Sequence, residues 1–311
     1  MNLATIDVGT NTTLLLVARV ARAADGELEI TLLEERAAIT RLGRGIGAGG
    51  VLGAEGISRT LAALTDFAAV SRKHDARIVA VGTEALRRAP NASDFLGPAA
   101  LILDTPIEVI DGSREAALTF RAVRAAFADT AQGPLVVVDI GGGSTEIVLA
   151  SDGQVTFRVS LPLGSVRLTE RHMRRDPPAD DEIAAVRAAV DTALAQVPFA
   201  PATDSASLVG VAGTVTTLAA MAQHLETYDP GRVHGYRLES AELARQIERL
   251  RTASQVERER MPGLDPRRAD VILAGALILE GISRRAGVTE IRVSDRGIRW
   301  GLLHEILDPR T

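Results

Sequence analysis

Two short segments combine an acidic residue, a glycine turn and several hydroxyl side chains. IDVGTNT places Asp7 between two apolar runs, and DIGGGSTE places Asp139 directly after the apolar run Leu135 to Val138. A glycine turn exposes backbone N–H groups without a Cβ that would keep a ligand away, which suits phosphate oxygens. Nearby hydroxyl groups can add donors, and carboxylates can hold Mg²⁺ or Mn²⁺ directly or through water. The two segments therefore predict phosphate binding together with a divalent cation.

The candidate residues divide into turn residues and acids. We expect phosphate contacts from the turn residues Gly9, Thr10, Asn11, Thr12, Gly141, Gly142, Gly143, Ser144 and Thr145. Asp7 and Asp139 are the candidate metal ligands. A single turn of this kind could equally be a tight β-hairpin in which glycine supplies a positive φ. Two such turns, each preceded by an aspartate and each opening one half of the chain, favour phosphate binding.

The elements around these turns have the pattern of a mixed α/β protein. Short β-branched runs predict strands, and Ala/Leu/Arg-rich runs with apolar residues three and four apart predict helices. Strands are expected at 4–7, 13–20, 29–37, 77–81, 107–110, 135–140, 146–150, 155–161, 208–212 and 290–293. Helices are expected at 54–74, 113–127, 180–196, 214–224, 240–252, 266–286 and 295–307.

Both halves of the chain begin in the same way, with a strand that ends in Asp-x-Gly, a turn and a second apolar strand. This weak internal repeat puts Asp7 and Asp139 in corresponding places and predicts two related lobes. Turn-forming residues near 129–133 mark the boundary, so we expect lobes at 1–128 and 129–311. The last helix, about residues 295–311, is assigned to the second lobe and could pack back on the first.

Composition excludes several classes of protein. The chain of 311 residues is long enough for two cores, has no cysteine and carries a net charge of -5. Disulfides, thiolate metal sites and a cysteine nucleophile are therefore excluded, and general nucleic-acid binding is not expected. No apolar run is long enough to cross a bilayer, and no export signal is present, so we expect a cytoplasmic protein without membrane contacts.

Taken together, these segments resemble the exopolyphosphatase and guanosine pentaphosphate phosphohydrolase (Ppx/GppA) family, which has the actin-like ATPase fold. The resemblance spans nearly the whole chain and is closest to the short, two-lobe form of the family. It implies two actin-like, ribonuclease H-like α/β lobes with a cleft between them. Further matching segments are ITRLGRGIGAGGVLGAEGI (39–57), VGTEALRRAPN (81–91), EVIDGSREAAL (108–118), LPLGSVRLTE (161–170), GVAGTVTTLAAM (210–221), HGYRL (234–238), DPRRADVILAGALIL (265–279) and SDRGIRWGLL (294–303).

The resemblance also implies roles for individual residues. Glu115 matches the catalytic glutamate of the family and would act as the general base, whereas from the residues alone it would more simply offset a helix dipole. Glu146 matches the second acid, which orients the attacking water or a metal ion. Arg87 matches an arginine that holds a phosphate, for which a guanidinium is well shaped. The roles of His234 and of Trp300, which replaces an acid common in the family, stay open.

The function implied by this resemblance is a Mg²⁺- or Mn²⁺-dependent hydrolase. It would release terminal phosphate from inorganic polyphosphate, the 5′ phosphate of guanosine pentaphosphate, or both, and a homodimer is expected from the family. One alternative is a kinase or ATPase of the same fold, with residues 210–214 contacting adenosine. Another is a sensor that binds polyphosphate or a nucleotide without turnover. The presence of both Glu115 and Glu146 favours the hydrolase.

Overall fold

The computed structural model describes residues 1–22, 28–46, 50–199 and 206–308. Residues 47–49, within the family-like segment 39–57, and residues 309–311, at the end of the expected last helix, lie outside the described residues. The chain divides into two compact units, Met1–Leu118 with Ile298–Thr311, and Thr119–Gly297. The first division falls inside a helix, at Leu118, and so earlier in the chain than the boundary proposed at residue 128.

Unit 1 is built on a five-stranded sheet with the order β3-β2-β1-β4-β5. Strands β1 and β2 and strands β2 and β3 pair antiparallel, whereas β4 pairs parallel with β1 and β5 pairs parallel with β4. The strands are β1 (Asn2–Val8), β2 (Thr12–Arg22), β3 (Leu28–Ile39), β4 (Ala76–Gly82) and β5 (Ile107–Val109). The helices are α2 (Ala54–Lys73), α3 (Glu84–Arg88), α4 (Ser93–Leu103) and α13 (Ile298–Leu307), with the first half of α5 (Gly112–Ala126).

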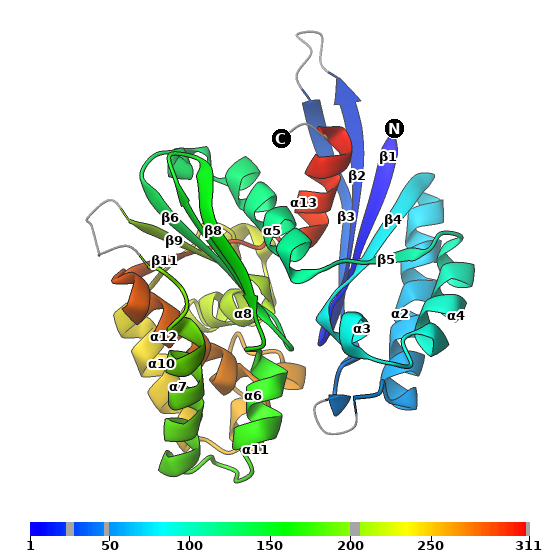
Figure 1. Cartoon of the computed structure of the whole chain (residues 1–311). Helices are drawn as coiled ribbons and strands as arrows, with labels where there is room; N and C mark the ends of the chain where they lie inside the picture. The colour runs from blue at the N-terminus through cyan, green and yellow to red at the C-terminus, as the bar shows by residue number, and fades with distance from the viewer. Residues whose placement is uncertain (23–27, 47–49, 200–205, 309–311) are drawn as a thin grey trace. The chain divides into compact units, whose positions relative to one another are not determined.

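Helices cover both faces of this sheet (Figure 1). Alternate residues of β4 divide between two apolar clusters: Ala80 packs with the residues of α2 and α4, whereas Val81 packs with Leu118 of α5 and Ile298 of α13. Because strand side chains alternate between faces, the second cluster defines the face on which α5 and α13 lie. This face is the one that concerns the candidate site.

Unit 2 repeats the same arrangement on a six-stranded sheet with the order β10-β11-β9-β6-β7-β8. The strands β8-β7-β6-β9-β11 correspond in order and direction to β3-β2-β1-β4-β5 of unit 1, and β10 adds an antiparallel edge strand next to β11. The strands are β6 (Pro134–Ile140), β7 (Thr145–Ser151), β8 (Gln154–Leu161), β9 (Ser207–Val211), β10 (Arg237–Glu239) and β11 (Glu290–Val293). The predicted internal repeat and the predicted class of two actin-like α/β lobes are confirmed.

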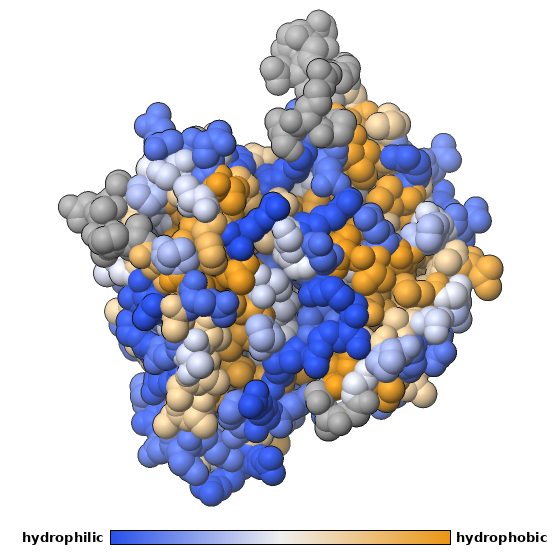
Figure 2. Space-filling view, in the orientation of Figure 1, coloured by the Kyte–Doolittle hydropathy of each residue, from blue (hydrophilic) through white to orange (hydrophobic). Residues whose placement is uncertain are grey.

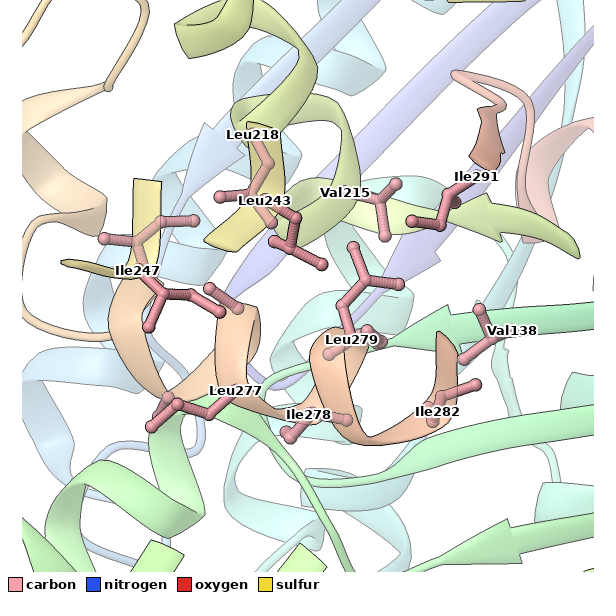
Figure 3. Packing of buried hydrophobic residues seen from close by; sticks show 14 of the residues in the cluster. Val138, Val215, Leu218, Leu243, Ile247, Leu277, Ile278, Leu279, Ile282 and Ile291 are labelled. Carbon is pink, nitrogen blue, oxygen red and sulfur yellow. The ribbon is translucent and has the colours of Figure 1, made fainter. Parts of the chain in front are cut away.

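The helices of unit 2 bury one face of its sheet. Val138 of β6 and Ile291 of β11 pack against Leu279 and Ile282 of α12, in the cluster drawn in Figure 3. The helices are α6 (Ser165–His172), α7 (Asp180–Leu194), α8 (Ala212–Ala222), α9 (Pro230–Val233), α10 (Ser240–Thr252), α11 (Gln255–Arg258) and α12 (Ile272–Ala286), with the second half of α5. Hydrophilic side chains cover the end of this unit that carries α11 and the acidic first turn of α7 (Figure 2).

Most expected elements are present, and the differences have local causes. The helix expected from Pro266 begins at Ile272, because Asp265 caps a separate short turn by accepting a hydrogen bond from the Arg267 N–H. Helices α3, α4, α6, α9 and α11 and strand β10 were not predicted, and α4 contains Pro98, a residue that normally ends a helix. No helix of the described residues is long and apolar enough to cross a membrane.

Candidate active site

The turn between β1 and β2 is closed by a hydrogen bond from the Gly9 N–H to the Thr12 carbonyl, with N and O 3.1 Å apart. A Cβ on Gly9 would lie 2.8 Å from that oxygen, so the turn requires glycine at this position. Thr10 and Asn11 form the tip, and both side chains are largely buried. Within the described part of the chain, the Asn11 Nδ2 group is buried and donates no hydrogen bond. A buried donor of this kind is available to a ligand oxygen.

A separate segment fixes the orientation of this turn. The carbonyl of Thr10 accepts a hydrogen bond from the Gly43 N–H at 2.9 Å, and the carbonyl of Asn11 accepts one from the Arg41 N–H at 3.0 Å. In a trans peptide the carbonyl and the following N–H point in opposite directions. The N–H groups of Asn11 and Thr12 therefore point away from residues 41–43. Arg41 thus contacts the turn through its backbone.

The second turn, between β6 and β7, has the same closure. The Gly141 N–H donates to the Ser144 carbonyl at 3.0 Å, and the carbonyls of Gly141 and Gly142 accept from the first N–H groups of α6. The carbonyl of Gly143 accepts from Arg167 Nε at 2.8 Å. Because these carbonyls face α6, the N–H groups of Gly142, Gly143 and Ser144 face the opposite side. Among the described residues, none of these three N–H groups donates a hydrogen bond.

Both predicted phosphate turns are therefore braced on their carbonyl side, and the second turn is open on the side of the Gly142, Gly143 and Ser144 N–H groups. A row of N–H groups that point the same way is a binding site for an anion. The short helix α6 is not itself that site, because its first N–H groups are already bonded to the turn. The segment LPLGSVRLTE matched the family in the sequence, but its role as a brace for the second turn could not be read from it.

Two acidic residues lie side by side at the end of β6. Asp139 of β6 pairs directly with Glu146 of β7 in the antiparallel register, and Glu146 pairs with Ser160 of β8. Val138 and Ile140 belong to the core on the α12 side, so Asp139 faces the opposite side of the sheet. Asp139 and Glu146 are both buried, with 7% and 2% of their surface exposed. The expected pair of carboxylates is thus formed within unit 2.

Burial has an electrostatic consequence for Asp139. Desolvation raises the pKa of its carboxyl group to about 6, and the hydrogen bond from Thr119 opposes this shift. A bound cation would offset the same cost by favouring the charged carboxylate. Across the residues that the structure describes, no group of three or more His, Asp or Glu side chains forms a complete metal cage. Mg²⁺ commonly binds one or two carboxylates and completes its shell with water and substrate phosphates, so the pair fits Mg²⁺.

Glu115 and Arg87 meet in unit 1. Glu115 lies in the first turn of α5, and Arg87 Nη1 donates to Glu115 Oε2 at 3.3 Å and to the Ile110 carbonyl at 2.7 Å. The Glu115 side chain is 7% exposed and that of Arg87 is 28% exposed. The neighbouring Arg88 pairs with Glu84 instead. The structure thus brings the predicted base and the predicted phosphate-binding arginine together.

Asp7 lies on the same side of the unit 1 sheet as α5 and α13. Thr5, two residues earlier in β1, donates from its hydroxyl to the Arg299 carbonyl of α13. Asp7 also pairs with Val81 of β4, which packs with Leu118 of α5. Strand alternation therefore directs the buried Asp7 carboxylate to the face that carries Glu115.

The two residues with open roles have structural partners. The His234 ring stacks on Phe127 with centroids 4.8 Å apart, and burial and two nearby arginines lower the pKa of His234 to about 4. Trp300 in α13 donates from Nε1 to the Glu35 carboxylate on β3 at 3.2 Å. Both residues thus help to hold elements together within their own unit.

Comparison with known proteins gives a consistent result. A sequence model described as the Ppx/GppA phosphatase family matches residues 19–309. The chain is similar to exopolyphosphatase 2 of Mycobacterium tuberculosis, with 40% identity over 314 residues that cover 96% of each chain. The structure is similar to that of a Ppx/GppA family member from Aquifex aeolicus, with a TM-score of 0.81, 33% identity and coverage of 100% and 99%. An exopolyphosphatase from Cytophaga hutchinsonii has a TM-score of 0.90 at 27% identity and covers 100% of this chain and 99% of its own.

Proposed function

Because the chain belongs to the Ppx/GppA phosphatase family and is a phosphoanhydride hydrolase, we propose that it releases the terminal phosphate of inorganic polyphosphate. The names of its mycobacterial relatives support this substrate. The observation that carries the proposal is the second turn, whose N–H groups at Gly142, Gly143 and Ser144 all face one side. Uncompensated donors in a row suit the densely charged oxygens of a phosphate chain.

In the proposed reaction, water attacks the terminal phosphorus and the bond to the bridging oxygen breaks. Glu115 accepts the proton of the attacking water, and the products are inorganic phosphate and a chain one unit shorter. Arg87 lies next to Glu115 and can hold a phosphate oxygen close to the base. The turn N–H groups and the Asn11 amide bind the other phosphate oxygens. The roles of Thr10 and Thr12 as further donors belong to this proposal, whereas the Thr145 hydroxyl, expected to contact phosphate, donates to the Leu163 carbonyl instead.

Asp7, Asp139 and Glu146 are the proposed ligands of Mg²⁺ or Mn²⁺. The cation would neutralise phosphate charge as the anhydride bond breaks. Within unit 2, Asp139 and Glu146 occupy directly opposed positions on adjacent strands, which allows both carboxylates to contact one ion or its water shell. Activity that persists in excess chelator would remove these three residues from the metal role.

The test is a phosphate-release assay that runs long-chain polyphosphate, guanosine pentaphosphate and ATP side by side, with Mg²⁺ and with chelator. We expect the highest kcat/KM with polyphosphate. In excess chelator, we expect no phosphate release from any of the three substrates. Preference for guanosine pentaphosphate would make that nucleotide the substrate of the same site. Phosphate transfer from ATP to an acceptor would favour a kinase, and tight polyphosphate binding without phosphate release would favour a sensor. We also propose a cytoplasmic homodimer, which sedimentation of the purified protein and cell fractionation can test.

A further inference from the structure

A row of polar side chains crosses three adjacent strands of unit 2 at the candidate site. Asp139 of β6, Glu146 of β7 and Ser160 of β8 occupy directly paired positions in the sheet. Directly paired residues project from the same face, so all three lie on the side of the sheet opposite the α12 core. Helix α5 covers this side, where Thr119 contacts Asp139.

Each carboxylate in this row receives a hydrogen bond from one hydroxyl group. Thr119 Oγ1 donates to Asp139 Oδ2 at 3.1 Å, and Ser160 Oγ donates to Glu146 Oε1 at 2.6 Å. Thr119 is 1% exposed, so its hydroxyl has little access to water as an alternative partner. The two hydroxyls flank the carboxylate pair, one from the helix above the sheet and one from the neighbouring strand.

The hydrogen bond from Thr119 leaves the other oxygen of Asp139 available. Among the described residues, Asp139 Oδ1 accepts no hydrogen bond, and this oxygen is not fully buried. A hydrogen bond to one oxygen restricts the rotation of the carboxylate, and so it limits the directions in which the second oxygen can point. Such a group binds a cation without first losing rotational freedom.

We propose that Thr119 and Ser160 are positioning residues, which hold Asp139 and Glu146 in the orientation that binds the divalent cation and the substrate phosphate. The inference rests on the proposed function, because it assumes that these two carboxylates are the cation ligands. Neither hydroxyl contacts the reacting atoms, and both act through the carboxylate that they orient. Thr119 also lies four residues after Glu115 in α5, so the two side chains project from the same face of this helix.

The first experiment compares two variants of Thr119 that remove different parts of the side chain. Thr119→Val keeps the shape and loses the hydroxyl, whereas Thr119→Ser keeps the hydroxyl and loses a buried methyl group. We expect Thr119→Val to lower kcat by about 10- to 100-fold with little change in KM for polyphosphate. Thr119→Ser should retain kcat within about threefold of wild type while it lowers Tm, because a buried methyl group is lost. If Thr119 had only a structural role, kcat in both variants would fall in step with Tm.

Thr60→Val is the matched control for this pair. Thr60 is also a fully buried helical threonine, and its hydroxyl donates to the Gly56 carbonyl at 2.7 Å, away from the carboxylates. Its loss should change Tm without changing kcat or the cation dependence. If Thr60→Val lowers kcat as much as Thr119→Val does, the hydroxyl of Thr119 has no special role.

The second experiment measures cation binding directly, without substrate or turnover. Binding of Mn²⁺ to the full chain can be followed by electron paramagnetic resonance, which reports the free ion. We expect Thr119→Val and Ser160→Ala each to weaken Mn²⁺ binding by about 10- to 100-fold. Ser160→Thr keeps a hydroxyl group at this position and should bind Mn²⁺ about as tightly as the wild type. Thr156→Val is the control on the same strand, because the Thr156 hydroxyl donates to the Leu149 carbonyl instead.

The outcomes separate this inference from the proposed function. Wild-type Mn²⁺ affinity in both Thr119→Val and Ser160→Ala would overturn the positioning role, whatever the substrate proves to be. If the wild-type enzyme prefers another phosphoanhydride, the proposed substrate fails while the Mn²⁺ measurement still decides the inference. Should Thr119→Val not fold, Ser160→Ala with its threonine rescue gives the same decision, because Ser160 is only partly buried.

Discussion

The guanidinium of Arg87 holds the Glu115 carboxylate in unit 1, with Nη1 and Oε2 3.3 Å apart. The same nitrogen donates to the Ile110 carbonyl at 2.7 Å, so Arg87 itself is anchored to the strand end before α5. The side chain of Glu115, the proposed base, therefore has a defined partner, and a guanidinium can also bind phosphate.

Glu115→Gln tests the base. The amide keeps nearly the same shape and can still accept a hydrogen bond from Arg87, but it cannot take a proton from water. We expect kcat for phosphate release to fall by about 10²- to 10⁴-fold. KM should stay unchanged or decrease, because one negative charge near a polyanion is lost. Wild-type kcat on every phosphoanhydride tested would show that Glu115 is not the base.

Arg87→Ala should behave differently, since it removes a phosphate contact and a partner of Glu115. We expect a higher KM for polyphosphate, with a larger effect at low ionic strength, where charge attraction is least screened. Because Arg87 and Glu115 are in contact, the double variant should cost less than the sum of the two single effects. Strict additivity in kcat/KM would mean that the contact has no role in catalysis.

The sequence predicted the strands around both turns because these segments are continuous runs of apolar, largely β-branched residues. Such runs are typical of buried strands. It also placed Asp139 and Glu146 at the second turn, since both belong to one contiguous motif. It could not predict that Thr119 and Ser160 contact them. Those contacts depend on strand register and on how α5 packs, which no local pattern specifies.

The same limit explains other differences. Helix α6 was missed because its eight residues carry only a short amphipathic pattern, and its start is fixed by bonds to the Gly141 and Gly142 carbonyls. The two units divide at Leu118 inside α5, and a continuous helix has no turn-forming residues that would mark such a division in the sequence. The spacing of Thr119 four residues after Glu115 was the one available signal for that side chain.

Asp139→Asn tests how much the buried, charged carboxylate of Asp139 lowers the free energy of unfolding when no metal is bound. The pKa of Asp139 rises from 3.8 to about 6 on folding, so its contribution to stability is fully present below pH 3.8 and is lost as the pH rises through about 6. Relative to the asparagine variant, the wild-type protein in chelator should lose on the order of 2–3 kcal/mol between pH 4 and pH 8. Urea unfolding at several pH values measures this difference. If the difference in unfolding free energy between wild type and variant does not vary with pH, the Asp139 carboxylate is not buried as described. Added Mg²⁺ should stabilise the wild type at pH 8 more than the variant.

Helix α13 packs on α5, the helix that carries Glu115, and this packing can be tested. A Cβ built on Gly301 of α13 would lie 1.9 Å from the Leu118 carbonyl oxygen of α5, so the two backbones are in direct contact. Arg114 of α5 adds an ion pair with Glu305 of α13, with N and O 2.8 Å apart. Any side chain at position 301 must therefore push the two helices apart.

Gly301→Ala should destabilise the protein by about 1–3 kcal/mol or more, although alanine is the better helix former. The control is Gly97→Ala in α4, where a Cβ would meet no atom within 4 Å apart from its chain neighbours. The better helix propensity of alanine is opposed there by crowding from the ring of Pro98, so that variant should change stability by less than about 1 kcal/mol. Because Leu118 follows Glu115 by one turn of α5, Gly301→Ala should also lower kcat in the fraction that stays folded, whereas Gly97→Ala should not. Urea unfolding and phosphate release measured on both variants decide the matter, and equal stability of the two would show that α13 and α5 are not packed backbone to backbone.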